Sequence, residues 1–453
     1  MGCPVVRGEE TRPNIVLLVS DDQRPDTIAA LGNSHIRTPH LDRLVADGMA
    51  FTRAVCPNPL CVPSRAELLT GCSGFRNGIL PGYTNRLDES LVTLPQELAA
   101  AGYRTWYVGK WHTQGQPQQR GYAATRGLFR GAGLETTIAV DALGVAVTGY
   151  RGWGFHDERG RVQRERGGGL TPDISAAFAD AAIEVIETAG DEPYFLHVNF
   201  TAPHDPLLWP TGYESLYDSA ALPLPENYLS HHPFDHGNLG GRDERLWPQE
   251  RDEQLVRRHL AVYYAVISHM DAQIGRILAA LDDAGQRERT IVIFTSDHGL
   301  AIGSHGLRGK QNMYEHTIGV PLVMAGPGIS ASQSSAAQVY LRDLYPTICE
   351  LAGTEVPQTV CAKSFADVLR GEADRHHAAV FGYFRDVQRM VRSERWKLIV
   401  YPQVSRAQLF DLAGDPHERV DLMGNPSHAE RVVRLRGLLT DWQADGNDPL
   451  AAP

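Results

Sequence analysis

The stretch Asn14–Asp22 (NIVLLVSDD) decides the fold class of this 453-residue chain. Its apolar run is short and continuous, which is typical of a strand buried on both faces of a parallel sheet. The run stops at two acids, Asp21 and Asp22. Ligands of open α/β sheets bind outside the carboxyl ends of the strands, so these carboxylates are candidates for a site. Alternatively, the pair simply caps a following helix.

Similar apolar runs predict four more strands, at Thr105–Val108, Tyr194–Phe200, Thr290–Ser296 and Val320–Ala325. Between these runs, Pro172–Ala189 and Gln254–Asp283 carry apolar residues at helical spacing. Strands that alternate with helices predict an α/β fold, in which helices cover both faces of a large mixed, mostly parallel sheet. Two segments without such patterns, Thr113–Leu170 and Pro206–Arg251, are predicted to be long loops of the kind that carry function.

The pattern changes after about residue 370. Short, closely spaced strands are predicted there, followed by one helix, at Val380–Phe384, Gln388–Val391, Trp396–Tyr401, Gln408–Leu412 and Ser427–Gln443. This order is typical of a small α+β unit with an antiparallel sheet. We therefore predict a catalytic α/β domain over residues 1–370 and a C-terminal α+β subdomain over residues 371–453.

Composition narrows the range of partners and locations. The net charge of -11 is spread along the chain, which disfavours binding to nucleic acid. No segment approaches the roughly 20 apolar residues of a membrane span. The N-terminus lacks the pattern of a signal peptide, so we expect a cytoplasmic protein unless a leader was removed. Reduced, packed thiols are then expected at Cys56, Cys72, Cys349 and Cys361.

A second acidic motif ends the predicted strand Thr290–Ser296. It contains Asp297 and His298, about 275 residues after Asp21 and Asp22. The two motifs can meet if their strands are neighbours, because the carboxyl ends of parallel strands share one edge of the sheet. Such a group of carboxylates would repel itself without a cation, and its oxygen-rich character favours Ca²⁺, Mg²⁺ or Mn²⁺ over Zn²⁺.

The segment Leu60–Gly71 (LCVPSRAELLTG) carries the most specific signal in the chain. Its C-x-P-S-R turn followed by L-T-G closely resembles the signature of the sulfatase family, in the alkaline-phosphatase-like superfamily. The resemblance runs from Asn14 to about Leu422. It implies that Cys61 is oxidised to formylglycine by a formylglycine-generating enzyme. It also implies one divalent cation, most readily Ca²⁺, with the ligand set Asp21, Asp22, Cys61, Asp297 and His298, the last at a position where many members have Asn.

Within this resemblance, residue 61 would act as a hydrated aldehyde. One hydroxyl of the gem-diol, polarised by the metal, attacks sulfur and the substrate alcohol leaves. A base then takes the proton of the second hydroxyl, so that sulfate is eliminated and the aldehyde returns. The Pro-Ser-Arg turn also places Cys61 at a helix N-terminus, whose partial positive charge favours an anion.

Basic residues in three further motifs complete the predicted catalytic group. In the Gly-Lys-Trp-His motif, Lys110 and His112 lie two apart and so point the same way on an extended segment. The family pattern assigns Lys110 to sulfate binding, and we expect His112 to be the general base. It also makes His204 the candidate general acid, shared with Lys310. Arg65, in the signature itself, and these lysines supply positive charge for the sulfate.

Other residues have less specific interpretations. His40 is expected to be structural. The loop histidines His231, His232 and His236 are expected to be solvated, with a lining of the substrate pocket as the alternative. Arg385 and Gln388, in the predicted C-terminal sheet, are candidates for the rim of the site.

Three functions fit these motifs. The first is hydrolysis of a sulfate ester, and several segments look more like those of bacterial carbohydrate sulfatases, which favours a small sulfated saccharide. The second is an arylsulfatase or a phosphonate or phosphate ester hydrolase with the same formylglycine site; Ser64 favours sulfate over the phosphorus esters. The third is a binding protein for sulfated ligands that never acquires the modification, which the complete set of basic and acidic residues argues against.

Overall fold

A nine-stranded sheet forms the centre of the computed structural model, which describes residues 12–80, 82 and 84–451. The strand order is β12-β2-β11-β10-β1-β9-β6-β7-β8. The bounds are β1 Asn14–Ser20, β2 Met49–Phe51, β6 Arg104–Lys110, β7 Ala124–Gly131, β8 Trp153–His156, β9 Tyr194–Asn199, β10 Thr290–Ser296, β11 Leu322–Ala325 and β12 Gln333–Ser335. The strands β10, β1, β9, β6 and β7 run parallel, while β8 and β11 are antiparallel to their neighbours. The predicted mixed, mostly parallel sheet is confirmed.

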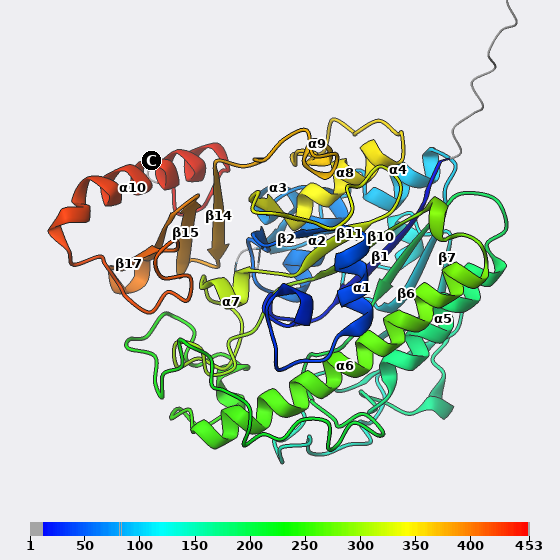
Figure 1. Cartoon of the computed structure of the whole chain (residues 1–453), viewed down its shortest axis with the longest axis horizontal. Coiled ribbons are helices and arrows are strands. Elements are labelled where there is room, and N and C mark those ends of the chain that lie inside the picture. Colours follow the sequence, from blue (N-terminus) through cyan, green and yellow to red (C-terminus); the bar gives the residue numbers. More distant parts are fainter. Residues whose placement is uncertain (1–11, 81, 83, 452–453) are drawn as a thin grey trace, which may run out of the picture.

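Alternate residues of β1 enter two separate cores, because successive side chains of a strand point to opposite faces. Val16 and Leu18 pack with α1 (Pro39–Asp47), α5 (Ile174–Thr188) and α6 (Glu253–Asp283). Leu17 and its odd-numbered neighbours pack instead with α2 (Cys61–Thr70), α4 (Leu94–Ala100) and α8 (Leu344–Leu351). Figure 1 shows these two layers of helices on either side of the sheet. The prediction that helices cover both faces is confirmed.

The C-terminal part is a four-stranded antiparallel sheet with one long helix. Its elements are β14 Ala379–Phe384, β15 Gln388–Ser393, β16 Trp396–Tyr401, β17 Arg406–Asp411 and α10 Ala429–Asp445. One face of the sheet packs on α10 through Leu398, Leu409 and Leu435, and Figure 1 shows the helix beside the strands. The other face packs on Met313 and neighbouring residues of the catalytic part. The predicted α+β character is confirmed, whereas the boundary at residue 370 stays a prediction.

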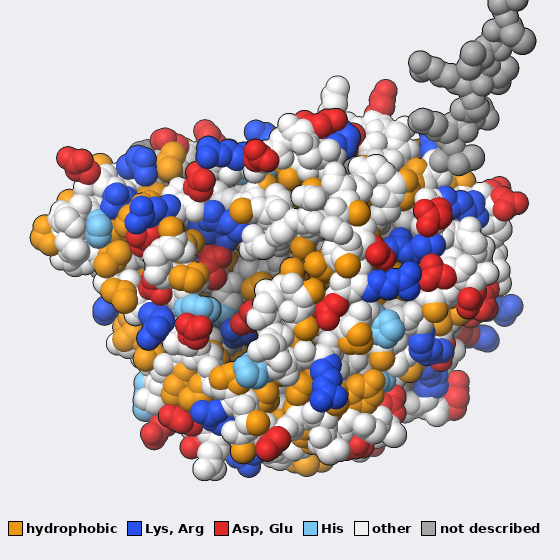
Figure 2. Space-filling view, viewed as in Figure 1, with side chains coloured by type: hydrophobic (Ala, Val, Ile, Leu, Met, Phe, Trp, Pro, Cys, Tyr) orange, Lys and Arg blue, Asp and Glu red, His pale blue; other side chains and the backbone are white. Residues whose placement is uncertain are grey.

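Smaller elements complete the chain. They are β3 Ala54–Val55, α3 Gly74–Asn77, β4 Ile79–Leu80, β5 Thr84–Asn85, α7 Glu315–Ile318, β13 Val339–Tyr340 and α9 Ala366–Leu369, with short 3-10 turns η1 Ala29–Leu31, η2 Pro117–Arg120, η3 Arg164–Arg166, η4 Glu244–Leu246, η5 Arg287–Arg289, η6 Leu341–Asp343, η7 Pro402–Val404 and η8 Pro426–His428. None of the described helices combines the length and apolar character needed to span a membrane. Acidic and basic side chains are interspersed on the face shown in Figure 2, in line with a net charge that is spread along the chain.

One loop prediction is wrong. The segment Thr113–Leu170 contains β7 and β8, which extend the main sheet beyond β6. These strands lack a continuous apolar run, since β7 reads ATRGLFRG and buries Thr125, Leu128 and Phe129 among exposed or half-buried neighbours. The segment Pro206–Arg251 does lack strands and has only the short turn η4. The first 11 residues of the segment on which the signal-peptide prediction depends lie outside the described residues, and the cytoplasmic location stays a prediction.

Candidate active site

The two acidic motifs meet at the carboxyl edge of the sheet. β1 and β10 are adjacent and parallel, with Ser20 paired to Ser296, so the residues that follow both strands emerge side by side. Asp297 Oδ1 accepts a hydrogen bond from the backbone N–H of Asp22 at 3.1 Å. Asp22 itself turns with a positive φ of 65°. The predicted meeting of motifs far apart in the sequence is therefore confirmed.

Helix α2 brings the third component, Cys61, to this edge as its first residue. Leu60 is extended and supplies no side-chain cap to the first N–H groups of the helix. The Ser64 hydroxyl donates to the carbonyl oxygen of Asp297 at 2.6 Å and so anchors the helix to β10. The Cys61 thiol lies 3.4 Å from Asp21 Oδ1 and 3.5 Å from His298 Nε2. The Pro-Ser-Arg turn thus performs the positioning expected of it.

Four of the five predicted metal ligands form a compact donor group. One donor atom each from Asp21, Asp22, Cys61 and His298 lies within 4.8 Å of the other three. Asp22 Oδ2 is buried and lacks a hydrogen-bond partner among the described residues. His298 Nδ1 lies 3.0 Å from the carbonyl of Gly299, which can only accept, so Nδ1 carries a hydrogen and Nε2 is the nitrogen that faces the group. These features fit a cation with mainly oxygen ligands.

Asp297 lies at the margin of this donor group. Its Oδ1 accepts backbone hydrogen bonds from Asp22 and His298 and stands 3.7 Å from His298 Nε2. Its Oδ2 pairs with Arg65 at 3.0 Å. Burial raises the pKa of Asp297 to about 7, with Asp21 acting in the same direction. Its place in the ligand set stays a prediction.

Cationic side chains balance the carboxylates of the cluster. Lys310 Nζ lies 2.7 Å from Asp22 Oδ1 and 3.3 Å from the Cys61 sulfur, and Lys110 pairs with Asp21. Burial opposes ionisation of the Cys61 thiol, but Lys110, Lys310 and nearby His298 hold its pKa well below the usual value. Arg65, one helical turn after Cys61, pairs with Asp297 and Asn199. Because three cations already offset three carboxylates, a bound divalent ion would make the site net positive and suited to an anionic ester.

The end of β6 carries Lys110 and His112 to the site. Val108 pairs with Arg126 and Gly109 with Leu128, so Gly127 is the extra residue of a bulge in β7, and Gly109 opposite it has a φ of 89°. Lys110 and His112 line the same pocket, whereas Trp111 between them enters the core, which confirms that the two basic residues share a direction. Burial lowers the pKa of His112, so the ring is neutral and able to accept a proton near neutral pH.

His204 faces the cluster from the other side. Its Nδ1 lies 2.6 Å from the carbonyl oxygen of Asp205, so Nδ1 carries a hydrogen and Nε2 is the atom that exchanges a proton. Nε2 is 3.9 Å from Asp22 Oδ2. Burial opposes the charge, but Asp22 and Asp205 raise the pKa of His204 overall. A histidine that holds its proton at this position can donate it to a leaving oxygen.

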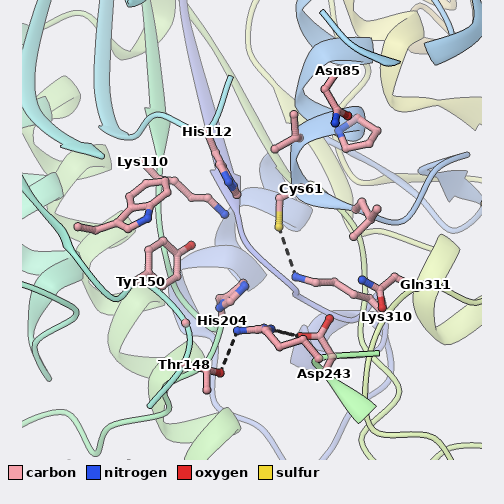
Figure 3. Close-up of a pocket in the computed structure, with 16 residues that line it drawn as sticks. Cys61, Asn85, Lys110, His112, Thr148, Tyr150, His204, Asp243, Lys310 and Gln311 are labelled. Atoms are coloured by element: carbon pink, nitrogen blue, oxygen red, sulfur yellow. Dashed lines mark hydrogen bonds and ion pairs between the residues drawn. The ribbon is translucent and has the colours of Figure 1, made fainter. Parts of the chain in front are cut away.

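The cluster opens into a pocket of about 570 Å³. Figure 3 shows Cys61 directed into this pocket, with Lys110 and His112 on one side, Lys310 on the other and His204 opposite. Residues that the sequence did not single out also line it: Leu60, Val62, Asn85, Thr148, Tyr150, Trp153, Arg242, Asp243 and Gln311. Leu60 and Val62 belong to the signature segment, whereas Asn85, Thr148, Tyr150 and Trp153 belong to no motif that the sequence analysis used and are identified by the tertiary structure.

Tyr150 and Arg242 are the best-placed of these additional residues. The Tyr150 hydroxyl donates to Asp21, and its ring meets His204 edge-on at 4.9 Å. Arg242 donates two hydrogen bonds, of 2.7 and 3.0 Å, to the carboxylate of Asp205. Asp205 therefore connects the pocket wall to His204, while Tyr150 fixes a carboxylate of the donor group.

Comparison with known proteins agrees with this geometry. A family model described as "Sulfatase" matches residues 13–354, about three quarters of the chain. The chain belongs to the sulfatase family. A second model, "N-sulphoglucosamine sulphohydrolase, C-terminal", matches residues 303–445. The protein is thus an enzyme that hydrolyses sulfate esters, and its family implies both a metal ion and a formylglycine.

Relatives of this sulfatase include enzymes for different sulfate esters. It is 28% identical to an arylsulfatase of Clostridium perfringens, over 94% of each chain. It is 26% identical to an N-acetylglucosamine-6-O-sulfatase of Bacteroides thetaiotaomicron, over 99% of this chain and 89% of the relative. Nearly the whole chain is therefore shared with both.

Solved structures support the fold of this sulfatase. One, a complex with its substrate D-glucosamine-2-N,6-O-disulfate, has a TM-score of 0.79 at 23% identity and covers 97% of this chain and 99% of that one. Another, the phosphonate monoester hydrolase of Agrobacterium radiobacter, has a TM-score of 0.80 at 22% identity and covers 96% of both chains. At these identities the likeness shows a common alkaline-phosphatase-like fold.

The remaining predicted residues lie outside the pocket of this sulfatase. His40 packs on Gly275 of α6, which agrees with a structural role. Of the loop histidines, His231 is exposed, but the solvated state expected for His232 and His236 is wrong, because both are buried. They hydrogen-bond to Tyr314 and Gln388 instead of lining the pocket.

The two candidates for the rim of the site differ. Gln388 is buried and donates to the carbonyl of Gln311, so it supports the pocket wall from behind. Arg385 is exposed and is not among the residues that line the pocket. A direct role at the rim stays a prediction for both.

Proposed function

We propose that this sulfatase acts on a small sulfated saccharide. The observation that carries the proposal is the set of polar side chains in the pocket lining around Cys61, namely Asn85, Arg242, Asp243 and Gln311. Carboxylate, amide and guanidinium groups suit the hydroxyls of a sugar better than an aryl ring, and Trp153 offers one aromatic surface beside them. The pocket volume suits a ligand of one or two sugar rings. The substrates for which the glucosamine disulfate complex and the N-acetylglucosamine-6-O-sulfatase are named belong to this class.

Two groups that the family implies would supply the attacking oxygen. A cation held by Asp21, Asp22, Cys61 and His298, with Asp297 beside them, would polarise the hydrated aldehyde of a modified residue 61. We propose Ca²⁺ as that cation, because oxygen donors dominate the group.

The protein's own side chains would bind sulfate and move protons. Lys110 and Lys310 would bind the sulfate oxygens. His204 would protonate the leaving alcohol from Nε2, and neutral His112 would accept a proton when sulfate is released. Arg65 touches Asp297 rather than the pocket, so it would position the cluster instead of contacting substrate. Overall, water and the ester yield the alcohol and sulfate.

Conversion of Cys61 would have to precede folding. The residue is only 6% exposed, and its backbone is the first turn of a buried helix. We propose that a formylglycine-generating enzyme acts on the motif as an unfolded segment.

The test is a substrate panel on protein produced with a formylglycine-generating enzyme. The panel contains N-acetylglucosamine 6-sulfate, glucosamine N-sulfate, nitrophenyl sulfate and a phenyl phosphonate monoester. We expect the highest kcat/KM on a saccharide sulfate. A higher kcat/KM on nitrophenyl sulfate would favour an arylsulfatase. A higher kcat/KM on the phosphonate would favour a phosphonate ester hydrolase. Either result would overturn the proposal of a saccharide substrate. Arg242→Ala should lower kcat/KM on the saccharide more than on nitrophenyl sulfate.

A further inference from the structure

A second group of metal-ligating side chains lies away from the active site, where the C-terminal sheet begins. It joins Asp343, which ends η6 and precedes α8, to His376 and His377, just before β14. His377 Nε2 lies 2.8 Å from Asp343 Oδ2, and His376 Nε2 lies 3.4 Å from the same oxygen. One donor atom from each residue lies within 4.8 Å of the other two.

These spacings match those of a first coordination shell. With metal–ligand bonds of about 2.0–2.2 Å, neighbouring donor atoms of a tetrahedral site lie roughly 3.3 Å apart. The observed separations of 2.8 and 3.4 Å bracket this value. Little movement would bring the three atoms around one ion.

One imidazole nitrogen of this second metal-ligating group has no hydrogen-bond partner among the described residues. The His376 side chain is only 9% exposed, and its Nε2 lacks a hydrogen-bond partner among the described residues. A buried polar atom without a partner is costly, and a ligand that accepts its lone pair removes that cost. This nitrogen is aimed at the same carboxylate oxygen that His377 approaches.

The carboxylate is held in place by the surrounding backbone. Asp343 Oδ2 accepts from the N–H of Tyr340 at 2.8 Å, and Oδ1 accepts from the N–H of Lys363 at 3.3 Å. The two imidazoles pack edge-on against aromatic rings, His376 against Phe365 and His377 against Tyr340. Fixed outer contacts of this kind orient the ligands of protein metal sites.

Charge also favours a cation there. The neighbouring Arg342 pairs with Glu67 of α2 at 2.9 Å. Among the described residues, the two histidines are the salt-bridge partners of the Asp343 carboxylate, with no lysine or arginine within pairing distance. A carboxylate flanked by two imidazoles is thus left to bind a positive ion.

We propose that Asp343, His376 and His377 form a second metal site, which takes Zn²⁺ or a similar first-row ion. Two imidazoles and one carboxylate suit such ions and not Ca²⁺ or Mg²⁺, which prefer oxygen ligands. Asp343 lies just before α8, and the two histidines lie just before β14. A bound ion would therefore connect the start of the C-terminal sheet to the catalytic part. Water would complete the coordination. The site is structural, because it lies outside the catalytic pocket.

The test compares Zn²⁺ binding by the whole protein and by matched variants. Each protein is stripped with a chelator, saturated with Ca²⁺, titrated with Zn²⁺ by calorimetry and analysed for bound zinc after gel filtration. The His376→Gln/His377→Gln double variant keeps amide groups that can donate to Asp343, so its fold should persist. We expect it to lose one equivalent of Zn²⁺ and the Zn²⁺-dependent rise in melting temperature that the wild type shows. His231→Gln, a change of an exposed histidine, should behave as the wild type.

Co²⁺ provides a second, spectroscopic measurement. The wild type should show the visible absorption bands of low-coordinate Co²⁺ in excess over the double variant. Equal zinc stoichiometry, equal melting shifts and equal Co²⁺ spectra in the wild type and the double variant would overturn the proposal. That outcome would leave Asp343 and the histidines as a hydrogen-bonded group only.

Discussion

The surroundings of residue 61 were largely predicted from the sequence. The signature predicted both its place at a helix N-terminus and its neighbours, and the thiol does lie between Asp21, His298 and Lys310. The sequence could not show that Tyr150 and Asp205 contact the same cluster, since Tyr150 belongs to no motif and Asp205 occupies the variable position of the loop motif that contains His204. Their roles depend on loops whose paths are set by the whole fold.

Cys61→Ser and Cys61→Ala should both abolish sulfate release. Serine keeps a hydroxyl at the helix N-terminus but has no second hydroxyl from which sulfate can be expelled. Turnover of nitrophenyl sulfate is the measurement, with mass spectrometry of the residue-61 peptide to establish conversion of the wild type to the aldehyde. Retained turnover in either variant would contradict the role given to this residue.

His204→Ala should affect substrates according to their leaving groups. Loss of a general acid should lower kcat/KM on a saccharide sulfate by about 10²–10⁴-fold. Nitrophenolate needs little protonation, so the loss on nitrophenyl sulfate should be less than about tenfold. His231→Ala, a change of an exposed histidine, is the control. Equal losses on both substrates would remove His204 as the acid.

At the scale of elements, the sequence predicted strands with continuous apolar runs and missed those without them. β1 and β10 have the bounds expected from their runs, whereas β7 and β8 carry polar and glycine residues and are held by their neighbours. The bulge in β7, at Gly127 opposite the end of β6, was not predicted from the sequence either.

Gly109→Ala should disrupt the end of β6, where Gly109 pairs with Asn199 of β9. A Cβ at Gly109 would stand 2.0 Å from the carbonyl oxygen of Asn199, and the φ of 89° is itself unfavourable for alanine. The backbone conformation alone costs roughly 1–3 kcal/mol, and the clash adds to it. The control is Gly285→Ala, at a φ of 64° with nothing within 4 Å of the new Cβ. Urea unfolding should show a larger loss of stability for Gly109→Ala, and equal losses would contradict the importance of the close approach.

Helix α1 receives its N-terminal cap from α6. Asp271 of α6 accepts from the N–H groups of His40 and Leu41 at 3.2 and 2.7 Å, while Thr38 supplies no side-chain cap. Burial raises the pKa of Asp271 to about 7, above the value of 3.8 for a free carboxyl. The native state therefore binds a proton that the unfolded state has lost between these two pH values, and stability falls as pH rises through this window.

Asp271→Asn should remove this pH dependence. Between about pH 4 and pH 7, the melting temperature of the wild type should fall relative to that of the variant, and above pH 7 the difference should level off. Melting temperatures measured at half-unit steps of pH test this. A constant difference across the range would contradict the raised pKa of Asp271.

For the whole molecule, the proposed cation site joins segments that the chain separates widely. Its donors follow β1, begin α2 and follow β10, so one bound ion would tie together elements from both ends of the catalytic part. The sequence predicted this convergence because parallel strands deliver their carboxyl ends to one edge. It did not predict the order of the outer strands, which pair through short segments such as β2 and β12.

Removal of the cation should destabilise the whole catalytic part and stop turnover. A ligand present at about 100 times its Kd stabilises the native state by roughly 2.7 kcal/mol, so chelation should lower the melting temperature by a few degrees. The experiment uses the His376→Gln/His377→Gln double variant, in which the proposed second site does not contribute. Ca²⁺ should restore both stability and activity. Asp22→Ala lacks a donor that lies against Lys310 and His298, so neither chelator nor Ca²⁺ should shift the melting temperature of this variant. An unchanged melting temperature and full activity after chelation would show that the carboxylate group is balanced by Lys110 and Lys310 alone.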